Sequence, residues 1–180
     1  AGETPKATEA PTQAEPAGEF YTAMVADTGG VNDQSFNQSA WEGLQAFGKS
    51  TGAKVSFLES KQASDYASNF DKLADEGANL IWGIGFTLAD ALSEASTMNP
   101  EQMYGIVDFD YGENTPDNVA CTTFNVQDSS FLVGYIAGLT TKTNRVGYIG
   151  GMKSPTMDLF EYGYRAGVAY AAKELGKKID

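Results

Sequence analysis

Short apolar runs alternate with amphipathic helical patterns from Phe20 onward, and this alternation constrains the fold more than any other feature of the chain. Strand–helix repeats of this length are typical of a parallel sheet with helices on both faces. The sequence therefore predicts a three-layer α/β fold. The predicted strands cover residues 20–26, 54–58, 80–83, 103–107, 119–124 and 145–149. The predicted helices cover residues 35–50, 64–77, 87–99, 127–141 and 154–176.

The turn between the first predicted strand and the first predicted helix is the most informative segment. Residues 27–38 (DTGGVNDQSFNQ) hold two glycines, two carboxylates, several amides and an aromatic side chain. In an open parallel sheet this turn lies at the carboxyl end of a strand, where such folds bind ligands. Ser35 and Gln38 have the spacing of a helix capping box, and Phe36 directly follows the predicted cap. We expect Phe36 at the mouth of a crevice, although a core position fits the pattern equally well.

Two further strand ends fall at the same expected edge of the sheet. Gly83-Ile-Gly85 resembles part of a dinucleotide-binding loop, but Leu88 replaces the third glycine. Close approach of the backbone to another group is the favoured interpretation. Residues 108–113 (DFDYGE) resemble half of a calcium loop, yet Gly112 stands one position too early. Asp108 ends a strand and is interpreted either as a hydrogen-bond acceptor for a neutral polar ligand or as a turn-forming residue.

Composition excludes several classes of function. The chain has 180 residues and no histidine, so neither a Ser-His-Asp nor a Cys-His arrangement is possible within it. Its single cysteine, Cys121, can form no internal disulfide. The net charge of −12 argues against binding to a nucleic-acid backbone. Asp27 and Asp108 leave open a hydrolase with two carboxylates, for which nothing in the sequence sets the separation.

The segment 27–43 (DTGGVNDQSFNQSAWEG) resembles the opening motif of the basic membrane protein family of bacterial lipoproteins. Further blocks follow in the family's order and extend the resemblance over roughly residues 20–175. These blocks are residues 84–86 (IGF), 104–108 (YGIVD), 130–138 (SFLVGYIAG), 146–152 (VGYIGGM) and 160–167 (FEYGYRAG).

This resemblance implies an extracytoplasmic substrate-binding protein of an ABC importer that binds purine nucleosides, performs no chemistry on them and needs no cofactor or metal. It also implies a type I periplasmic-binding-protein fold, whose two lobes close on the ligand. Carried over residue by residue, Phe36 stacks on the base and Asp108 hydrogen-bonds to the base edge. The remaining roles are polar contacts from the loop, through Asp27, Asn32, Asp33 and Ser35, and a pocket border formed by Gly85 and Phe86. Binding of another small polar solute, such as a sugar or a signalling ligand, stays open.

The expected organisation has three parts. Residues 1–18 lack any aromatic or large aliphatic side chain and are expected to be a disordered tether behind a lipid-anchored cysteine that is not in this chain. Residues 19–143 are expected to form the first lobe. Residues 144–180 are expected to supply only the first strand and helix of a second lobe that is mostly absent, with self-association through that part. A single complete six-stranded domain is the alternative. The Gly134-x-x-x-Gly138 and Gly163-x-x-x-Gly167 patterns predict close packing of helices on the sheet.

Overall fold

The computed structural model describes residues 20–180, so the expected tether over residues 1–18 lies outside the described range. The strands are β1 (Tyr21–Ala26), β2 (Lys54–Glu59), β3 (Leu80–Ile84), β4 (Met103–Val107) and β5 (Val119–Thr122). The α-helices are α1 (Phe36–Thr51), α2 (Asp65–Asp75), α3 (Ala89–Met98), α4 (Val126–Thr140) and α5 (Pro155–Glu174). Two short 3₁₀ helices, η1 (Phe86–Leu88) and η2 (Gly112–Asn114), follow β3 and β4.

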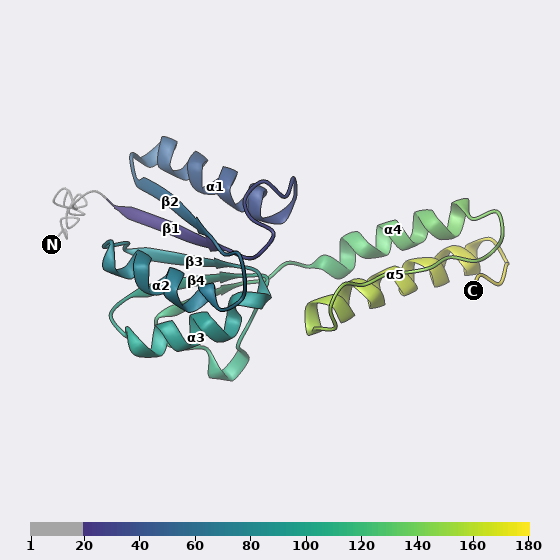
Figure 1. Ribbon diagram of the computed structural model, residues 1–180. Coiled ribbons are helices and arrows are strands. Elements are labelled where there is room, and N and C mark those ends of the chain that lie inside the picture. The colour runs from purple at the N-terminus through teal and green to yellow at the C-terminus, as the bar shows by residue number, and fades with distance from the viewer. Residues whose placement is uncertain (1–19) are drawn as a thin grey trace, which may run out of the picture.

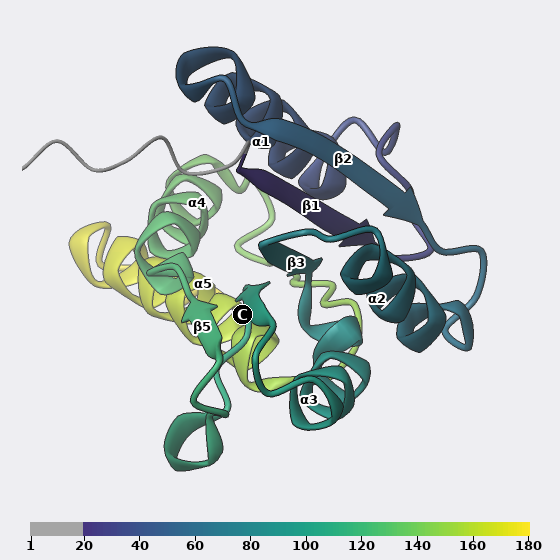
Figure 2. The ribbon, with the colours of Figure 1, turned by 90° about the vertical axis from the view of Figure 1, so that its left-hand side faces the viewer.

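The five strands form one parallel sheet in the order β2-β1-β3-β4-β5. Helix α1 packs on one face of this sheet, and α2 and α3 pack on the other (Figures 1 and 2). The predicted three-layer α/β architecture is therefore confirmed. The predicted third helix, residues 87–99, begins with the 3₁₀ turn η1, which contains Thr87, and α3 itself starts at Ala89.

Strand β1 shows why the sheet is central to the core. All six of its residues are buried, and alternate side chains point to opposite faces. Tyr21, Ala23 and Val25 belong to the cluster under α2 and α3, whereas Met24 and Ala26 belong to the smaller cluster under α1. A strand whose side chains are buried on both faces needs a layer of helices on each side. Here α1 provides one layer, and α2 and α3 provide the other.

Helices α4 and α5 form an antiparallel hairpin that extends away from the sheet (Figure 1). Helix α4 falls inside the range 19–143 expected for the first lobe, but it packs along α5 and not on the sheet. The linker 123–125 connects β5 directly to this hairpin. Ser154 caps α5, since its hydroxyl accepts a hydrogen bond from the Met157 N–H at 3.2 Å, and Pro155 occupies the first turn.

The two glycine pairs bring these helices together, and the expected packing of helix on sheet is wrong for them. A Cβ added to Gly134 would collide with the Tyr164 carbonyl oxygen, and one added to Gly167 would collide with that of Phe131. Gly163 meets the Gln127 carbonyl in the same way. Small residues at this spacing let two helix backbones approach closely, and here the partner is a helix.

The predicted strand over residues 145–149 does not form. This segment is extended coil beside α5, and only its start is paired through the backbone. The Val146 N–H donates to the Asp180 carbonyl at 2.8 Å, and the Asp180 N–H donates to the Asn144 carbonyl at 2.9 Å. A strand requires a second strand that pairs with it along its length, and within the described chain only residue 180 pairs with the backbone here.

Candidate ligand-binding site

The carboxyl ends of four strands meet at one edge of the sheet. The register pairs Ala26 with Ile84, Ile84 with Val107, and Val107 with Thr122. The residues that follow these strands are therefore aligned along one edge. The strand order reverses at β1 and β3, and in open α/β sheets the crevice at such a reversal is the usual ligand site. Asp27 and Gly85 follow these two strands, and Asp108 follows β4.

The loop between β1 and α1 is organised by two carboxylates. Asp27 Oδ1 accepts hydrogen bonds from the Gly29 N–H and from Asn37 Nδ2, both at 2.8 Å. Asp33 Oδ1 accepts from the N–H groups of Ser35 (2.9 Å) and Gln38 (3.1 Å). Ser35 makes no capping hydrogen bond with its side chain, so the predicted capping box is wrong. The helix start is capped instead by Asp33, because a charged carboxylate is a stronger acceptor than a hydroxyl.

The electrostatics of Asp33 follow from this cap. Desolvation raises the pKa of the carboxyl, but N–H donors from Asn37, Ser35 and Gln38 outweigh it and lower the pKa from 3.8 to about 2. Asp33 therefore stays ionised under all ordinary conditions and holds the first turn of α1 in place.

Phe36 and Gly85 are brought into direct contact across the crevice. A Cβ at Gly85 would lie 3.3 Å from Cε1 of Phe36, and Gly85 has a φ of +100°, which L side chains rarely adopt. The expected close approach at Gly85 is thus an approach to the Phe36 ring. Phe36 as a whole remains 38% exposed, so the residue is accessible to a partner.

Asp108 combines an unusual backbone with an unbonded carboxylate. Its φ is +64°, in the left-handed region, while its N–H donates to the Thr122 carbonyl at 2.7 Å. Burial raises the pKa of the Asp108 carboxyl, and within the described residues no hydrogen bond to the side chain offsets that burial. A partly buried acceptor without a donor, held in a strained conformation, is typical of a ligand-binding position.

The remaining predicted site residues are less engaged. Asn32 and Ser35 are exposed on the loop, and their side chains make no hydrogen bond within the described residues. Phe86 lies in a separate pocket of about 300 Å³ between the sheet edge and the start of α5. Phe109, Phe124 and Ser154 also line this pocket, which thus combines strand ends with the hairpin.

An apolar groove of about 740 Å³ runs from the sheet edge along the face that α1 covers only in part. Phe36 and Phe124 lie at one end of this groove, and Phe20 and Phe47 lie at the other. Trp82 contributes to its floor. Phe36 therefore belongs both to the crevice and to an apolar surface that continues behind it.

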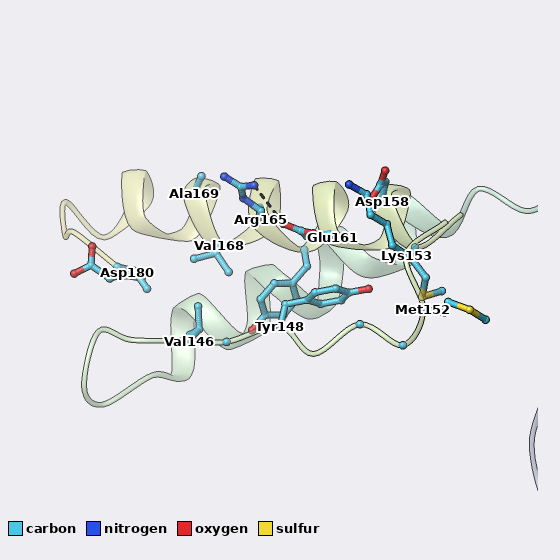
Figure 3. A pocket seen from close by; sticks show the side chains of 16 residues that line it. Val146, Tyr148, Met152, Lys153, Asp158, Glu161, Arg165, Val168, Ala169 and Asp180 are labelled. Atoms are coloured by element: carbon cyan, nitrogen blue, oxygen red, sulfur yellow. Dashed lines mark hydrogen bonds and ion pairs between the residues drawn. The ribbon is translucent and has the colours of Figure 1, made fainter. Parts of the chain in front are cut away.

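A third hollow, of about 770 Å³, lies between α5 and the coil over residues 146–153 (Figure 3), and none of the predicted site residues lines it. Its wall mixes charged side chains with apolar ones, and Arg165 pairs with Glu161 at 3.3 Å. Tyr148 packs beside Tyr164 with ring centroids 5.8 Å apart. None of the strand ends of the sheet contributes to this hollow.

Sequence reasoning missed three residues at the crevice. Asn37 bridges Asp27 and Asp33, and Glu59 Oε1 accepts the Val31 N–H at 2.9 Å to anchor the loop on β2. Phe124 follows the end of β5. The strand-end rule that identified Asp108 finds Phe124 when it is applied to β5, whereas Asn37 gives no signal beyond a polar residue in a first helical turn.

Within residues 20–180, no group of three His, Cys, Asp or Glu side chains is arranged to hold a metal ion. In the stretch that resembles a calcium loop, Asp110 accepts the Gly112 N–H at 2.8 Å, which is an ordinary turn. No helix in the described part of the chain is long and apolar enough to cross a membrane.

Known proteins resemble this chain in sequence and in fold. The chain is 46% identical over 155 residues to the CD4+ T-cell-stimulating antigen of Listeria monocytogenes, covering 83% of this chain and 43% of that protein. It is 42% identical over 166 residues to the ABC transporter nucleoside-binding protein BmpA of Lactococcus lactis, covering 90% of this chain and 46% of that protein. A solved ABC transporter solute-binding protein from Aeropyrum pernix K1 matches with a TM-score of 0.80 and 28% identity, covering 89% of this chain and 46% of the other.

Together, the parallel sheet, the crevice at its edge and the solved neighbour define the class: a lobe of the type I periplasmic-binding architecture, as found in ABC solute-binding proteins. Within that class, the family model Bmp, "ABC transporter substrate-binding protein PnrA-like", matches residues 20–176, and the chain belongs to this family. The chain spans less than half the length of the relatives described above.

Proposed function

We propose that this protein binds purine nucleosides for an ABC importer without chemistry on the ligand, and that the sheet edge supplies one wall of the site. The observation that carries the proposal is the exposed Phe36 ring, held against Gly85 at the same edge as the unbonded Asp108 carboxylate. A nucleoside needs an aromatic ring to stack on and acceptors for its N–H and O–H groups. The Lactococcus lactis relative is itself named as nucleoside-binding.

The polar loop fits a supporting role in this site. Asp27 and Asp33 are engaged with backbone N–H groups and Asn37, so they shape the loop that carries Phe36. Asn32 and Ser35 are exposed and free to contact a ligand, and Gly85 and Phe86 border the crevice. Because Asp27 Oδ1 already accepts two structural hydrogen bonds, a hydrolase that uses Asp27 and Asp108 as its acid and base gains no support.

We assign residues 20–122 to the first lobe and residues 126–180 to part of a second. The hairpin α4–α5 packs internally, and it adjoins the sheet edge at the pocket lined by Phe86 and Ser154. Closure of two lobes on a ligand at this junction agrees with that arrangement. The partner that receives the ligand is an ABC permease, and the protein is extracytoplasmic, held at the membrane by an N-terminal lipid.

The apolar groove and the outward face of α4 also support self-association of this 180-residue chain. Leu132, Val133 and Ile136 are exposed on α4, and exposed apolar faces recruit partners. Sedimentation velocity is expected to show concentration-dependent dimers. A single monomeric species at every concentration would exclude this part of the proposal.

A titration of the ¹⁵N-labelled chain tests nucleoside binding directly. Adenosine or guanosine, added to about 10 mM because half a site loses several kcal/mol, is expected to shift the amide signals of Phe36, Gly85 and Asp108. Uridine and ribose serve as controls for the base and the sugar. Shifts with ribose equal to those with adenosine would favour a sugar-binding site, and no shifts with any ligand would contradict the proposal.

A further inference from the structure

Asn37 is the most enclosed polar side chain at the crevice. It is 2% exposed and stands in the first turn of α1, directly after Phe36. Its Nδ2 donates to Asp27 Oδ1 at 2.8 Å and to Asp33 Oδ2 at 3.2 Å. Its backbone N–H donates to Asp33 Oδ2 at 2.9 Å. One neutral amide therefore bridges two carboxylates from opposite ends of the loop.

This bridge leaves one polar atom without a partner. The Asn37 Oδ1 atom is buried, and no hydrogen-bond donor for it is found among the described residues. A buried acceptor without a donor costs free energy, and native structures contain few of them. Both N–H groups of the amide are committed to the carboxylates, so the fold accepts an unsatisfied carbonyl in order to keep the bridge.

The bridge fixes the residues on both sides of it. Asp27 Oδ1 also accepts the Gly29 N–H, and Asp33 Oδ1 accepts those of Ser35 and Gln38. The loop and the first turn of α1 are thus tied to one side chain. Phe36 lies between the bridged loop and Asn37, and its ring rests against Gly85.

We propose that Asn37 is a positioning residue of the ligand site: by bridging Asp27 and Asp33 it fixes the loop and holds the Phe36 ring against Gly85. This inference deepens the proposed function and rests on it for the identity of the ligand. The placement of Phe36 can be measured without any ligand, so the two claims are separable.

The test compares Asn37→Ala and Asn37→Asp with the wild-type chain, and Gln38→Ala is the control. The Gln38 side chain bonds to Glu42 at 2.8 Å and only its backbone reaches Asp33, so its removal leaves the bridge intact. The measured quantities are the NOE between the Phe36 ring and the Gly85 Hα protons, and the exchange protection of the Gly29, Ser35 and Gln38 amides.

For Asn37→Ala we expect loss of the NOE and a fall of about tenfold or more in loop protection, with the amides of β1 and β3 unchanged. Gln38→Ala is expected to match the wild type. An Asn37→Ala chain that keeps both the NOE and the loop protection would overturn the inference.

The Asn37→Asp variant tests the bridge by comparing a single protein at two pH values. It provides the test if the Asn37→Ala variant does not fold. Its new carboxylate faces Asp27 from β1 and Asp33 from the loop, with Glu59 of β2 behind the loop at Val31. Like charges and burial raise its pKa, so lowering the pH favours the protonated acid, whose single O–H can donate to one of the two carboxylates but not to both. The NOE is expected to be absent at about pH 7.5 and to return in part at about pH 5, below the wild-type intensity. Equal NOE intensity at both pH values would contradict a polar bridge.

Adenosine titration adds the functional arm. Asn37→Ala is expected to weaken adenosine binding about tenfold relative to the wild type, while Gln38→Ala leaves it unchanged. Wild-type binding that survives unchanged in Asn37→Ala refutes the positioning role. Absence of binding in the wild type refutes the proposed function, and the NOE still decides the role of Asn37.

Discussion

The sheet domain (residues 20–122) and the helical hairpin (residues 126–174) bury their apolar side chains in different ways. In the sheet domain, β1 is enclosed between two layers, and Phe70 and Leu92 are fully buried against it. In the hairpin, glycines bring two backbones together, while Ile136 and its apolar neighbours stay 59% exposed. The first region is stabilised by buried side chains, and the second by backbone contact along one seam. Residues of the proposed site that need a fixed geometry all lie on the first region.

The largest expected effect concerns the core of the sheet domain. Phe70 is fully buried, lies under Gly83 and meets Tyr104 edge to face with centroids 6.1 Å apart. Phe70→Ala is expected to destabilise this domain by about 3–5 kcal/mol, as is usual for an aromatic removed from a closed core. The matched change in the hairpin, Ile136→Ala, is expected to cost less than about 0.5 kcal/mol.

Urea unfolding followed by tryptophan fluorescence measures the loss in the sheet domain, where Trp41 and Trp82 both lie, and far-UV circular dichroism of the same samples also reports the helices of the hairpin. Equal losses of unfolding free energy in the two variants would mean that the hairpin packs its side chains as tightly as the sheet domain does.

The second prediction addresses the seam of the hairpin. A side chain at Gly134 collides with the backbone of Tyr164, which cannot move as a flexible side chain would. Gly134→Val is expected to cost about 3 kcal/mol and to separate α4 from α5. Amide exchange should therefore rise in α4 and α5 and stay low in β1 and β3.

Gly43 provides the control for that substitution. A Cβ there meets nothing within 4 Å, so Gly43→Ala in α1 is expected to stabilise the chain by about 0.5–1 kcal/mol. Protected amides in α4 of the Gly134→Val chain would show that the glycine seam is not what joins the helices.

Much of the sheet domain could be predicted from the sequence because its signals are local. Apolar runs of strand length, separated by turns and amphipathic helices, identify β1 to β5 without reference to distant residues. The hairpin could not be predicted in this way. Gly134 and Gly167 predict close packing of their helices, but the sequence does not show whether each helix packs on a sheet or on another helix. The strand expected at residues 145–149 failed for the same reason, since pairing depends on a neighbour.

The candidate site shows the same division. The strand-end rule found Asp27, Gly85 and Asp108, because the carboxyl ends of parallel strands share one edge. The loop geometry escaped prediction: Asp33 replaces Ser35 as the cap, and Asn37 supplies a bridge that depends on two residues brought together by folding. Competition between two nearby acceptors is decided by their strength and distance, which spacing alone does not give.

The third prediction separates two phenylalanines of α1 that line the same groove. Phe36 is 38% exposed at the sheet edge, and Phe47 is 41% exposed near the opposite end. Phe36→Ala is expected to weaken adenosine binding by about 1–3 kcal/mol, the scale of a lost stacking partner. Phe47→Ala should leave the affinity unchanged, as measured by amide titration of each folded variant. An equal loss of adenosine affinity in both variants would indicate that the ligand binds in the groove and not at the sheet edge.

The smallest expected effect concerns the pH dependence of the cap. Asp33 has a folded pKa of about 2, below its ordinary 3.8, so its stabilising contribution is present above pH 3.8 and is lost as the pH falls through 2. The Tm difference between wild type and Asp33→Asn should be constant from neutral pH down to about 5 and shrink between about 4 and 2. Ser35→Ala should show a smaller difference at every pH. If the Tm difference between the wild type and Asp33→Asn does not change with pH, the charge of Asp33 does not contribute to the cap.

The most direct test of the account is the contact between a nucleoside and the Phe36 ring. With adenosine added to the labelled chain, intermolecular NOEs are expected from the base protons H2 and H8 to the Phe36 ring, because the exposed side of that ring is the proposed stacking surface. NOEs from the base to Phe47 or Leu80 inside the groove, with none to Phe36, would contradict the claim that the sheet edge is the nucleoside wall.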